Sequence, residues 1–242
     1  MKPYLFLLLL AAMLSWTASA QTATTPIPAT GLCNTGLTPA SPLPVGCTTS
    51  TFVTPVNPQS GGPSVDGNWQ LATPYPTEPY GHQAPYPCWV PTFGPAWVDV
   101  ASSDWFNPND GMSQWITPLV ENPTAGGWYV YRTPLPVPPA TPGYTGYELT
   151  VSGQIMNDDY PGGIFLGYGR SCTWVSLPTV TLIGNQAPDE AWNKFSFIVS
   201  VAPATQPYLY FLVYNIEFAG GNNNGNYQGL RVEFTSAYFT PI

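Results

Sequence analysis

The chain has 242 residues, of which 7% are charged and 14% aromatic, and its 13 acidic side chains outnumber 5 basic ones. This negative balance argues against nucleic acid, whose affinity for proteins comes mainly from Lys and Arg on phosphates, and against anionic membrane surfaces. Low charge together with 30 prolines is typical of a rigid extracellular β-protein, and not of an enzyme built around titratable side chains.

Residues 1–20 have the pattern of a secretory signal peptide. Lys2 provides the basic start, an apolar run follows over 4–14, and ASA at 18–20 is a small-residue cleavage site. The apolar run is too short to span a bilayer, and no later segment is long enough. Without Lys2, four basic and thirteen acidic residues remain, a net charge of −9. We therefore expect a protein at the cell surface, in the extracellular space or in the periplasm, without a transmembrane segment.

Four cysteines, Cys33, Cys47, Cys88 and Cys172, suit an oxidising compartment and allow three disulfide pairings. We favour Cys33–Cys47, which would staple a Pro- and Thr-rich segment, together with Cys88–Cys172, which would tie a long loop to the sheet. The cysteine spacing matches no zinc pattern, and His82 is the only histidine, so a structural zinc is not expected.

Short strand-like runs make up most of the chain beyond residue 67. Residues 21–30 (QTATTPIPAT) are interpreted as a polar linker that does not pack, and 31–67 are rich in Pro, Ser and Thr. The predicted strands, separated by Gly, Pro and Asn, cover 69–72, 96–100, 114–117, 128–132, 148–155, 164–168, 173–175, 180–183, 195–201, 208–214 and 230–239. Helical periodicity is not evident. The prediction for 31–242 is one all-β domain, a single antiparallel β-sandwich of about ten strands with long Pro- and Gly-rich loops.

Six stretches resemble, in order, a group of secreted bacterial jelly-roll domains of the carbohydrate-binding, galactose-binding-like type. The stretches are GLCNTGL (31–37), VDGNWQLATP (65–74), SQWITP (113–118), GGWYVYRTPLPVP (126–138), LTVSGQIMNDDYPGGIFLG (149–167) and QGLRVEFTSAYF (228–239). The resemblance implies a jelly-roll fold and a binding role without an established catalytic site. Members often carry a C-terminal sorting tail; the sequence stops at Ile242 without one, so anchoring by that route is not expected.

Tryptophans close to Asn and Asp are the leading candidate for a binding site. A ring can lie under the C–H face of a sugar while amides and carboxylates satisfy its hydroxyls. The candidate residues in the first window are Trp89, Trp97, Asp99, Asp104, Trp105, Asn107, Asn109 and Asp110. The alternative is that most of these rings belong to the core, although we expect Trp105 to be exposed. A second candidate is the loop with Asn223, Asn224, Asn226 and Tyr227, which is otherwise a solvated hairpin loop.

Three successive oxygen-bearing residues, Asn157, Asp158 and Asp159, are expected on a turn directly after a strand. Calcium takes six to eight oxygen ligands, so this turn is a candidate calcium site, which the family resemblance also supports. The alternative is an ordinary Asx-rich turn. No EF-hand loop is present in the sequence, and no other cofactor is expected.

Three functions remain open at this stage. The leading hypothesis is a non-catalytic protein that binds carbohydrate or glycoconjugate. The second is a structural or adhesive surface protein that contacts other extracellular proteins. The third is a glycan-degrading hydrolase, which needs two carboxylates at a suitable separation. Pairs such as Asp104 and Asp110 exist, but a Ser–His–Asp triad has no distinctive signature around His82.

Overall fold

The computed structural model describes residues 24–37, 47, 54–55, 64–75, 87–90, 92–98, 112–118, 126–158, 160–176, 192–215 and 229–242. The predicted signal peptide therefore lies outside the described residues, as does the strand expected over 180–183. The elements are β1 (Ile27–Pro28), β2 (Thr54–Pro55), β3 (Ser64–Tyr75), the 3-10 turn η2 (Pro87–Trp89), β4 (Gly94–Val98), β5 (Ile116–Thr117), β6 (Gly127–Pro134), β7 (Tyr147–Asp158), β8 (Tyr160–Tyr168), β9 (Ser171–Ser176), β10 (Asn193–Val201), β11 (Tyr208–Asn215) and β12 (Gly229–Pro241).

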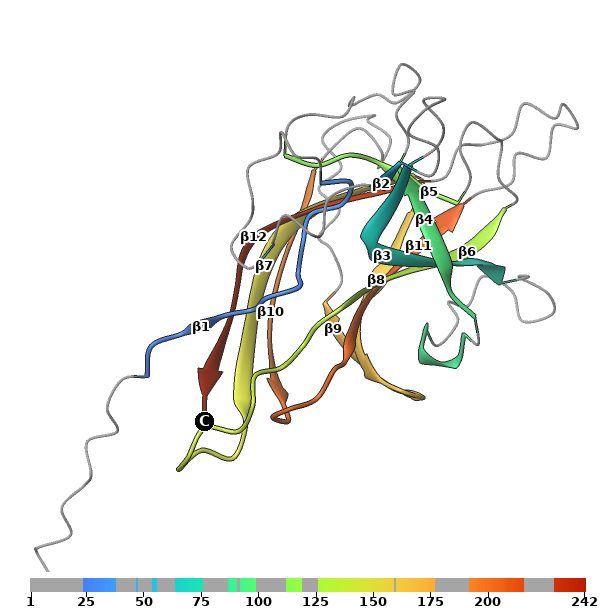
Figure 1. The fold of residues 1–242 in the computed structure, drawn as a ribbon. Helices are drawn as coiled ribbons and strands as arrows, with labels where there is room; N and C mark the ends of the chain where they lie inside the picture. Colours follow the sequence, from blue (N-terminus) through green and yellow to red (C-terminus); the bar gives the residue numbers. More distant parts are fainter. Residues whose placement is uncertain are drawn as a thin grey trace, which may run out of the picture.

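The fold is all-β and antiparallel, as predicted. The strands form one sheet in the order β10-β7-β12-β5-β4-β3-β6-β11-β8-β9, with β1 beside β12 and β2 beside β3. The short strands β4 and β5 join the half formed by β10, β7 and β12 to the half formed by β3, β6, β11, β8 and β9, so the sheet is continuous. In Figure 1, β7, β10 and β12 lie together on one side of the molecule, and β3, β4, β6 and β11 on the other. Among the described residues, no helix is long and apolar enough to cross a membrane.

Strand alternation creates the core between the two halves. Leu149, Val151 and Ile155 of β7 are buried, whereas the alternate residues Thr150, Ser152 and Gln154 are half-buried, as expected when successive side chains point to opposite faces. Aromatic rings join the two halves: the ring centroids of Phe195 on β10 and Phe211 on β11 lie 6.0 Å apart. The buried apolar surface of these rings is the main source of stability for such a fold.

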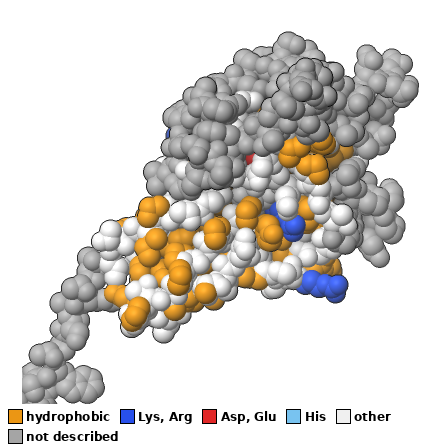
Figure 2. Space-filling view, viewed as in Figure 1, with side chains coloured by type: hydrophobic (Ala, Val, Ile, Leu, Met, Phe, Trp, Pro, Cys, Tyr) orange, Lys and Arg blue, Asp and Glu red, His pale blue; other side chains and the backbone are white. Residues whose placement is uncertain are grey.

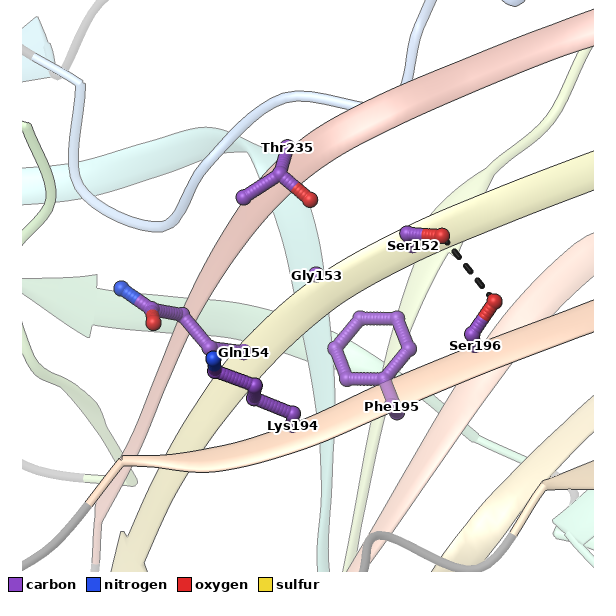
Figure 3. A pocket seen from close by; sticks show the side chains of 7 residues that line it. All are labelled: Ser152, Gly153, Gln154, Lys194, Phe195, Ser196 and Thr235. Carbon is purple, nitrogen blue, oxygen red and sulfur yellow. Dashed lines mark hydrogen bonds between the residues drawn. The ribbon is translucent and has the colours of Figure 1, made fainter.

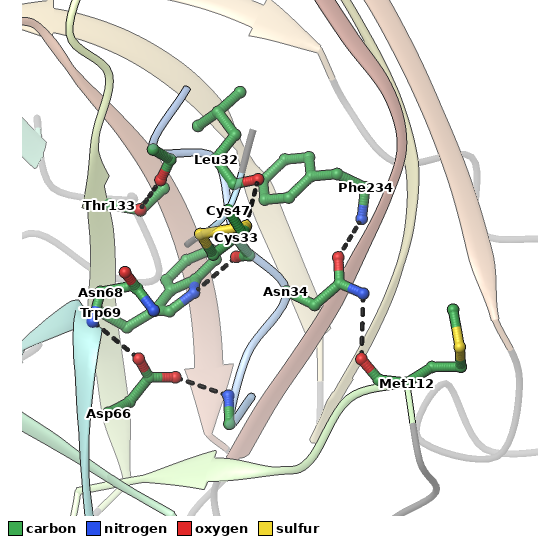
Figure 4. Close-up of a disulfide and its surroundings, with 12 residues drawn as sticks. Leu32, Cys33, Asn34, Cys47, Asp66, Asn68, Trp69, Met112, Thr133 and Phe234 are labelled. Atoms are coloured by element: carbon green, nitrogen blue, oxygen red, sulfur yellow. Dashed lines mark hydrogen bonds between the residues drawn. A yellow bond between two sulfur atoms is a disulfide. The ribbon is translucent and has the colours of Figure 1, made fainter. Parts of the chain in front are cut away.

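The N-terminal segment, residues 24–37, covers the free edge of β12 (Figure 4). Asn34 accepts a hydrogen bond from the Phe234 backbone N–H at 2.8 Å, and the Thr35 hydroxyl accepts one from Val232 at 3.1 Å. The Thr35 N–H in turn donates to the Val232 carbonyl at 3.1 Å. Side chains of this segment therefore satisfy backbone groups of β12 that a neighbouring strand would otherwise pair.

The interpretation of residues 21–30 as a linker that does not pack is wrong for the part that the structure describes. Ile27 and Pro28 form β1, which pairs with β12, and Ala29 is fully buried. The polar composition of this stretch concealed the packing, because its contacts are made with the far end of the chain and not with its neighbours in sequence.

Asp66 fixes the N-terminal segment to β3. One carboxylate oxygen accepts the Gly36 N–H at 2.6 Å, and the other accepts the Asn68 N–H at 2.8 Å (Figure 4). Nearby, the Trp69 indole donates to the Cys33 carbonyl at 3.0 Å. Burial raises the pKa of Asp66 from 3.8 to about 6, although the N–H donors around the carboxylate lower it. Desolvation thus outweighs hydrogen bonding, and the native state favours the protonated carboxyl group.

Both favoured disulfides are confirmed. Cys33 and Cys47 are bonded with a Cα–Cα distance of 5.5 Å, and Cys88 and Cys172 with one of 5.8 Å. The first disulfide lies beside the contacts that hold the N-terminal segment (Figure 4). Two disulfides indicate an oxidising location outside the cytoplasm.

Asp66 is expected to make stability depend on pH. The pKa of Asp66 is higher in the folded state than in the unfolded state. The contribution of the protonated carboxyl group to the free energy of unfolding is therefore fully present below about pH 3.8 and is lost as pH rises through about 6. The loss amounts to about 3 kcal/mol in the free energy of unfolding. Urea unfolding of the wild type and of Asp66→Asn between pH 3.5 and 7.5 checks this, because the two proteins have every other carboxyl group in common. If the free energy of unfolding changed equally with pH in both proteins, the prediction would be contradicted.

Candidate functional site

The outer side of the strands β6, β11, β8 and β9 is lined with rings, and we name it the aromatic face. Its members are Trp89, Phe93, Trp128, Phe165, Trp174, Tyr208, Tyr210 and Tyr214. They lie there because alternation on β6 and β11 sends every second residue away from the core. The surface view shows hydrophobic side chains reaching the surface on this part of the molecule (Figure 2).

Strand register places part of the aromatic face in one straight row across five strands. Gln70 pairs with Arg132, Arg132 with Tyr210, Tyr210 with Phe165, and Phe165 with Trp174. Adjacent strands lie about 4.8 Å apart, so Arg132 and Trp174 are separated by three spacings, about 14 Å. The row therefore combines hydrogen-bonding groups at one end with an exposed ring at the other.

The disulfide Cys88–Cys172 holds the turn η2 against the aromatic face. Its sulfur atoms lie over Gly167: a Cβ atom at this position would be 2.2 Å from the Cys88 Sγ and 3.0 Å from the Cys172 Sγ. The same Cβ would be 2.9 Å from the Tyr210 ring. Only glycine leaves room here, so the position of η2 requires that residue 167 of β8 has no side chain.

Trp89 and Trp174 are the exposed rings of the aromatic face, with 67% and 58% of their surfaces accessible. Each is tied to the disulfide: Trp89 follows Cys88, and Trp174 lies two residues after Cys172 on the same side of β9. The Trp89 indole N–H donates to the Arg170 carbonyl at 3.2 Å, and the Trp174 and Phe165 ring centroids lie 5.9 Å apart. Two large rings are thus exposed and held in fixed positions.

Arg132 packs against two rings of the aromatic face. Its guanidinium carbon is 3.7 Å from the Phe93 ring centroid and 4.1 Å from that of Tyr208. Its Nε donates to Gln70 Oε1 at 2.7 Å. Burial raises the pKa of Tyr210 above 10.0, while a hydrogen bond with Arg132 and its positive charge oppose the rise. Tyr210 therefore stays neutral at physiological pH, and its hydroxyl keeps its proton.

A polar groove of about 560 Å³ lies on the outer side of the opposite half of the sheet (Figure 3). Its lining consists of Ser152, Gly153, Gln154, Lys194, Phe195, Ser196 and Thr235. Ser152 and Ser196 share a hydrogen bond of 3.0 Å across β7 and β10. Thr235 is there because the register of β12 against β7 shifts between Phe234 and Ser236. The groove exposes hydroxyl, amide and ammonium groups but no exposed ring.

Beside the groove, two charged side chains of β12 are buried in a hydrogen-bonded network. Glu233 accepts hydrogen bonds from Ser113 and Gln154, both at 2.7 Å. Arg231 donates to the Ser113 hydroxyl at 2.6 Å, lies 3.6 Å from Glu233, and packs over the Trp192 ring. Each charge has its partner within the protein, so the network holds the segment 112–118 against β12.

The structure describes few of the predicted ligand-binding residues. Trp89 is exposed on the aromatic face, whereas Trp97 is half-buried in β4, between Val65 of β3 and Thr117 of β5. The rest of that set lies outside the described residues: Asp99, Asp104, Trp105, Asn107, Asn109, Asp110, Asn223, Asn224, Asn226 and Tyr227.

The expectation of a turn at 157–159 is wrong for its first two residues, because β7 continues through Asp158. Strand geometry sends the Asn157 and Asp158 side chains to opposite faces, so it does not bring them together as ligands of one ion. Asp159 lies outside the described residues. Within the described ranges, no three His, Cys, Asp or Glu side chains lie close enough to hold a metal. Calcium here stays a prediction.

Trp174 and Arg132 were missed as candidate site residues. A signal for Trp174 was present: once Cys88 and Cys172 are paired, alternation in SCTWVS places Trp174 on the same side as the disulfide and near Trp89. Arg132 gave no comparable signal, because its ring partners come from distant segments.

No protein-family model matches the chain, and no curated protein is significantly similar to it. The resemblance to jelly-roll carbohydrate-binding domains therefore stays a prediction. The function has to be inferred from the described residues and their geometry.

Gly167→Ala is expected to push the disulfide and η2 away from β8. Overpacking of this kind costs about 1–3 kcal/mol in the free energy of unfolding. Gly94→Ala is the matched control, because the nearest atom to its added Cβ is 4.0 Å away. Urea unfolding of both variants measures the difference. A Gly167→Ala protein as stable as the control would show that the packing of the disulfide on β8 is not tight.

Proposed function

We propose that the protein is a secreted, non-catalytic binding protein that recognises carbohydrate or glycoconjugate through the aromatic face. The observation that carries the proposal is the pair of exposed indoles, Trp89 and Trp174, each anchored beside the Cys88–Cys172 disulfide. The part of each ring that stays in water adds nothing to the stability of the fold, whereas a sugar can cover it.

The rigidity of the site supports a binding role. A sugar ligand loses freedom when it binds, and a preformed surface avoids the further cost of ordering the protein. The hydrogen bond from Trp89 to Arg170, the Trp174–Phe165 ring contact and the disulfide fix this surface before any ligand arrives. Polar groups at the far end of the row, from the half-buried Gln70 and Arg132, are of the kind that bonds sugar hydroxyls.

Replacing either exposed indole is expected to weaken glycan binding. Trp174→Ala and Trp89→Ala each remove a ring that a bound sugar would cover. Burying the apolar surface of such a ring contributes about 1.5–3 kcal/mol, so each change is expected to raise Kd by at least about tenfold. The measurement is retention on a panel of neutral and acidic polysaccharides, followed by calorimetric titration of those that bind. Ile198→Ala is the matched control, because Ile198 is 63% exposed on β10, away from the aromatic face.

Each outcome of this experiment has a definite meaning. Glycan binding that is unchanged in both Trp variants would contradict the stacking role. A chain that binds no glycan but self-associates or captures extracellular proteins would favour the adhesive function. Release of soluble sugar would favour the hydrolase. Repeating the titration with a chelator tests the predicted calcium site separately.

A further inference from the structure

Basic residues are scarce in this chain, and their positions are informative. The chain after the signal peptide has four: Arg132, Arg170, Lys194 and Arg231. Arg231 is buried in its network with Glu233, and Lys194 lines the groove on β10. The other two belong to the aromatic face. Figure 2 shows basic side chains at the surface beside hydrophobic ones on this side of the molecule.

Arg132 is arranged as a fixed hydrogen-bond donor. Phe93 and Tyr208 pack against its guanidinium group, whose central carbon lies 3.7 and 4.1 Å from the two ring centroids. With two rings against the group, the N–H bonds at its edge that Gln70 and Tyr210 do not use are the part that can contact a ligand. Gln70 holds Nε at 2.7 Å, which restricts rotation of the group. A guanidinium edge held in this way matches the two oxygens of a carboxylate or sulfate.

Arg170 adds a second positive charge near the exposed rings. It is exposed in the turn between β8 and β9, and its carbonyl accepts the hydrogen bond from Trp89. Its backbone position is therefore fixed relative to one of the rings that we propose to bind sugar. Arg132 is about 14 Å from Trp174 along the strand row, a distance set by three strand spacings.

We propose that the aromatic face recognises an anionic polysaccharide, with Arg132 and Arg170 pairing with oxyanions on the sugar units that Trp89 and Trp174 stack against. This inference rests on the proposed carbohydrate-binding function and names the ligand class. The oxyanion is a ring carboxylate or a sulfate ester, both of which fit a guanidinium group. The net charge of −9 repels polyanions overall, so binding of one depends on these local cations.

The test uses two pairs of polymers that differ only in charge. Polygalacturonate is compared with its fully methyl-esterified form, and dextran sulfate with dextran. We expect the wild type to bind one charged polymer at least about tenfold more tightly than its uncharged counterpart, since hydrogen bonds to charged groups are the stronger ones. The pair that shows the difference identifies the oxyanion as carboxylate or sulfate.

Variants assign the preference to the aromatic face. Arg170→Gln changes an exposed residue and is expected to lower only the affinity for the charged polymer. Arg132→Lys keeps the charge but loses the planar edge, and is expected to have the same effect. Lys194→Gln removes the same charge from the groove on the opposite half of the sheet and serves as the control. Trp174→Ala is expected to lower binding of charged and uncharged polymers alike.

Equal affinity for the charged and uncharged polymers, with the Trp dependence intact, would overturn the anionic class and leave the carbohydrate function standing. An equal loss in Lys194→Gln and Arg170→Gln would also overturn it, because the effect would then be general electrostatics. Binding to none of the four polymers would overturn this inference. If the protein also bound no polysaccharide of the panel used to test the proposed function, that function would be overturned too. Urea unfolding of Arg132→Lys shows whether its loss of affinity for the charged polymer is caused by impaired folding. If it is, the comparison of Arg170→Gln with Lys194→Gln decides the question.

Discussion

The attachment of residues 24–37 to β12 and β3 is the constraint on which the rest of the structure depends. This segment has little regular structure of its own, yet Asn34 and Thr35 pair with β12 while Asp66 of β3 holds Gly36. It therefore connects the two halves of the sheet at a place where only short strands join them. The buried carboxyl group of Asp66 is tolerated because several backbone N–H groups surround it.

The aromatic face depends on a different set of contacts from the core. Inward rings such as Phe195 and Phe211 stabilise the fold, whereas no second layer of sheet covers the outward rings in the part of the chain that the structure describes. The turn η2 and Phe93 cover part of this surface, and the Cys88–Cys172 disulfide keeps η2 in position. Trp89 and Trp174 remain exposed at its border. The face is thus partly a small second core and partly a surface available to a ligand.

The local sequence pattern predicted the strands but not the segments with which they pair. Alternation in 148–155 and 230–239 predicted β7 and β12, because one face of each is buried along its whole length. The role of residues 24–37 could not be predicted, since Thr35 and Val232 are separated by 197 positions. At the candidate site, the Cys88–Cys172 disulfide followed from the sequence, and Trp89 was among the predicted binding residues, a role that stays a prediction. The environment of Arg132 did not, because Phe93 and Tyr208 reach it from distant segments.

The pairing of β1 with β12 also affects the order in which the chain folds. Ile27 is opposite Phe239, and the Ile242 carbonyl accepts N–H groups of Thr145 and Gly146. β1 therefore cannot pair before β12 has been synthesised, so this part of the β12 edge stays uncovered while the residues between them are made. Contacts between residues this far apart in sequence form slowly.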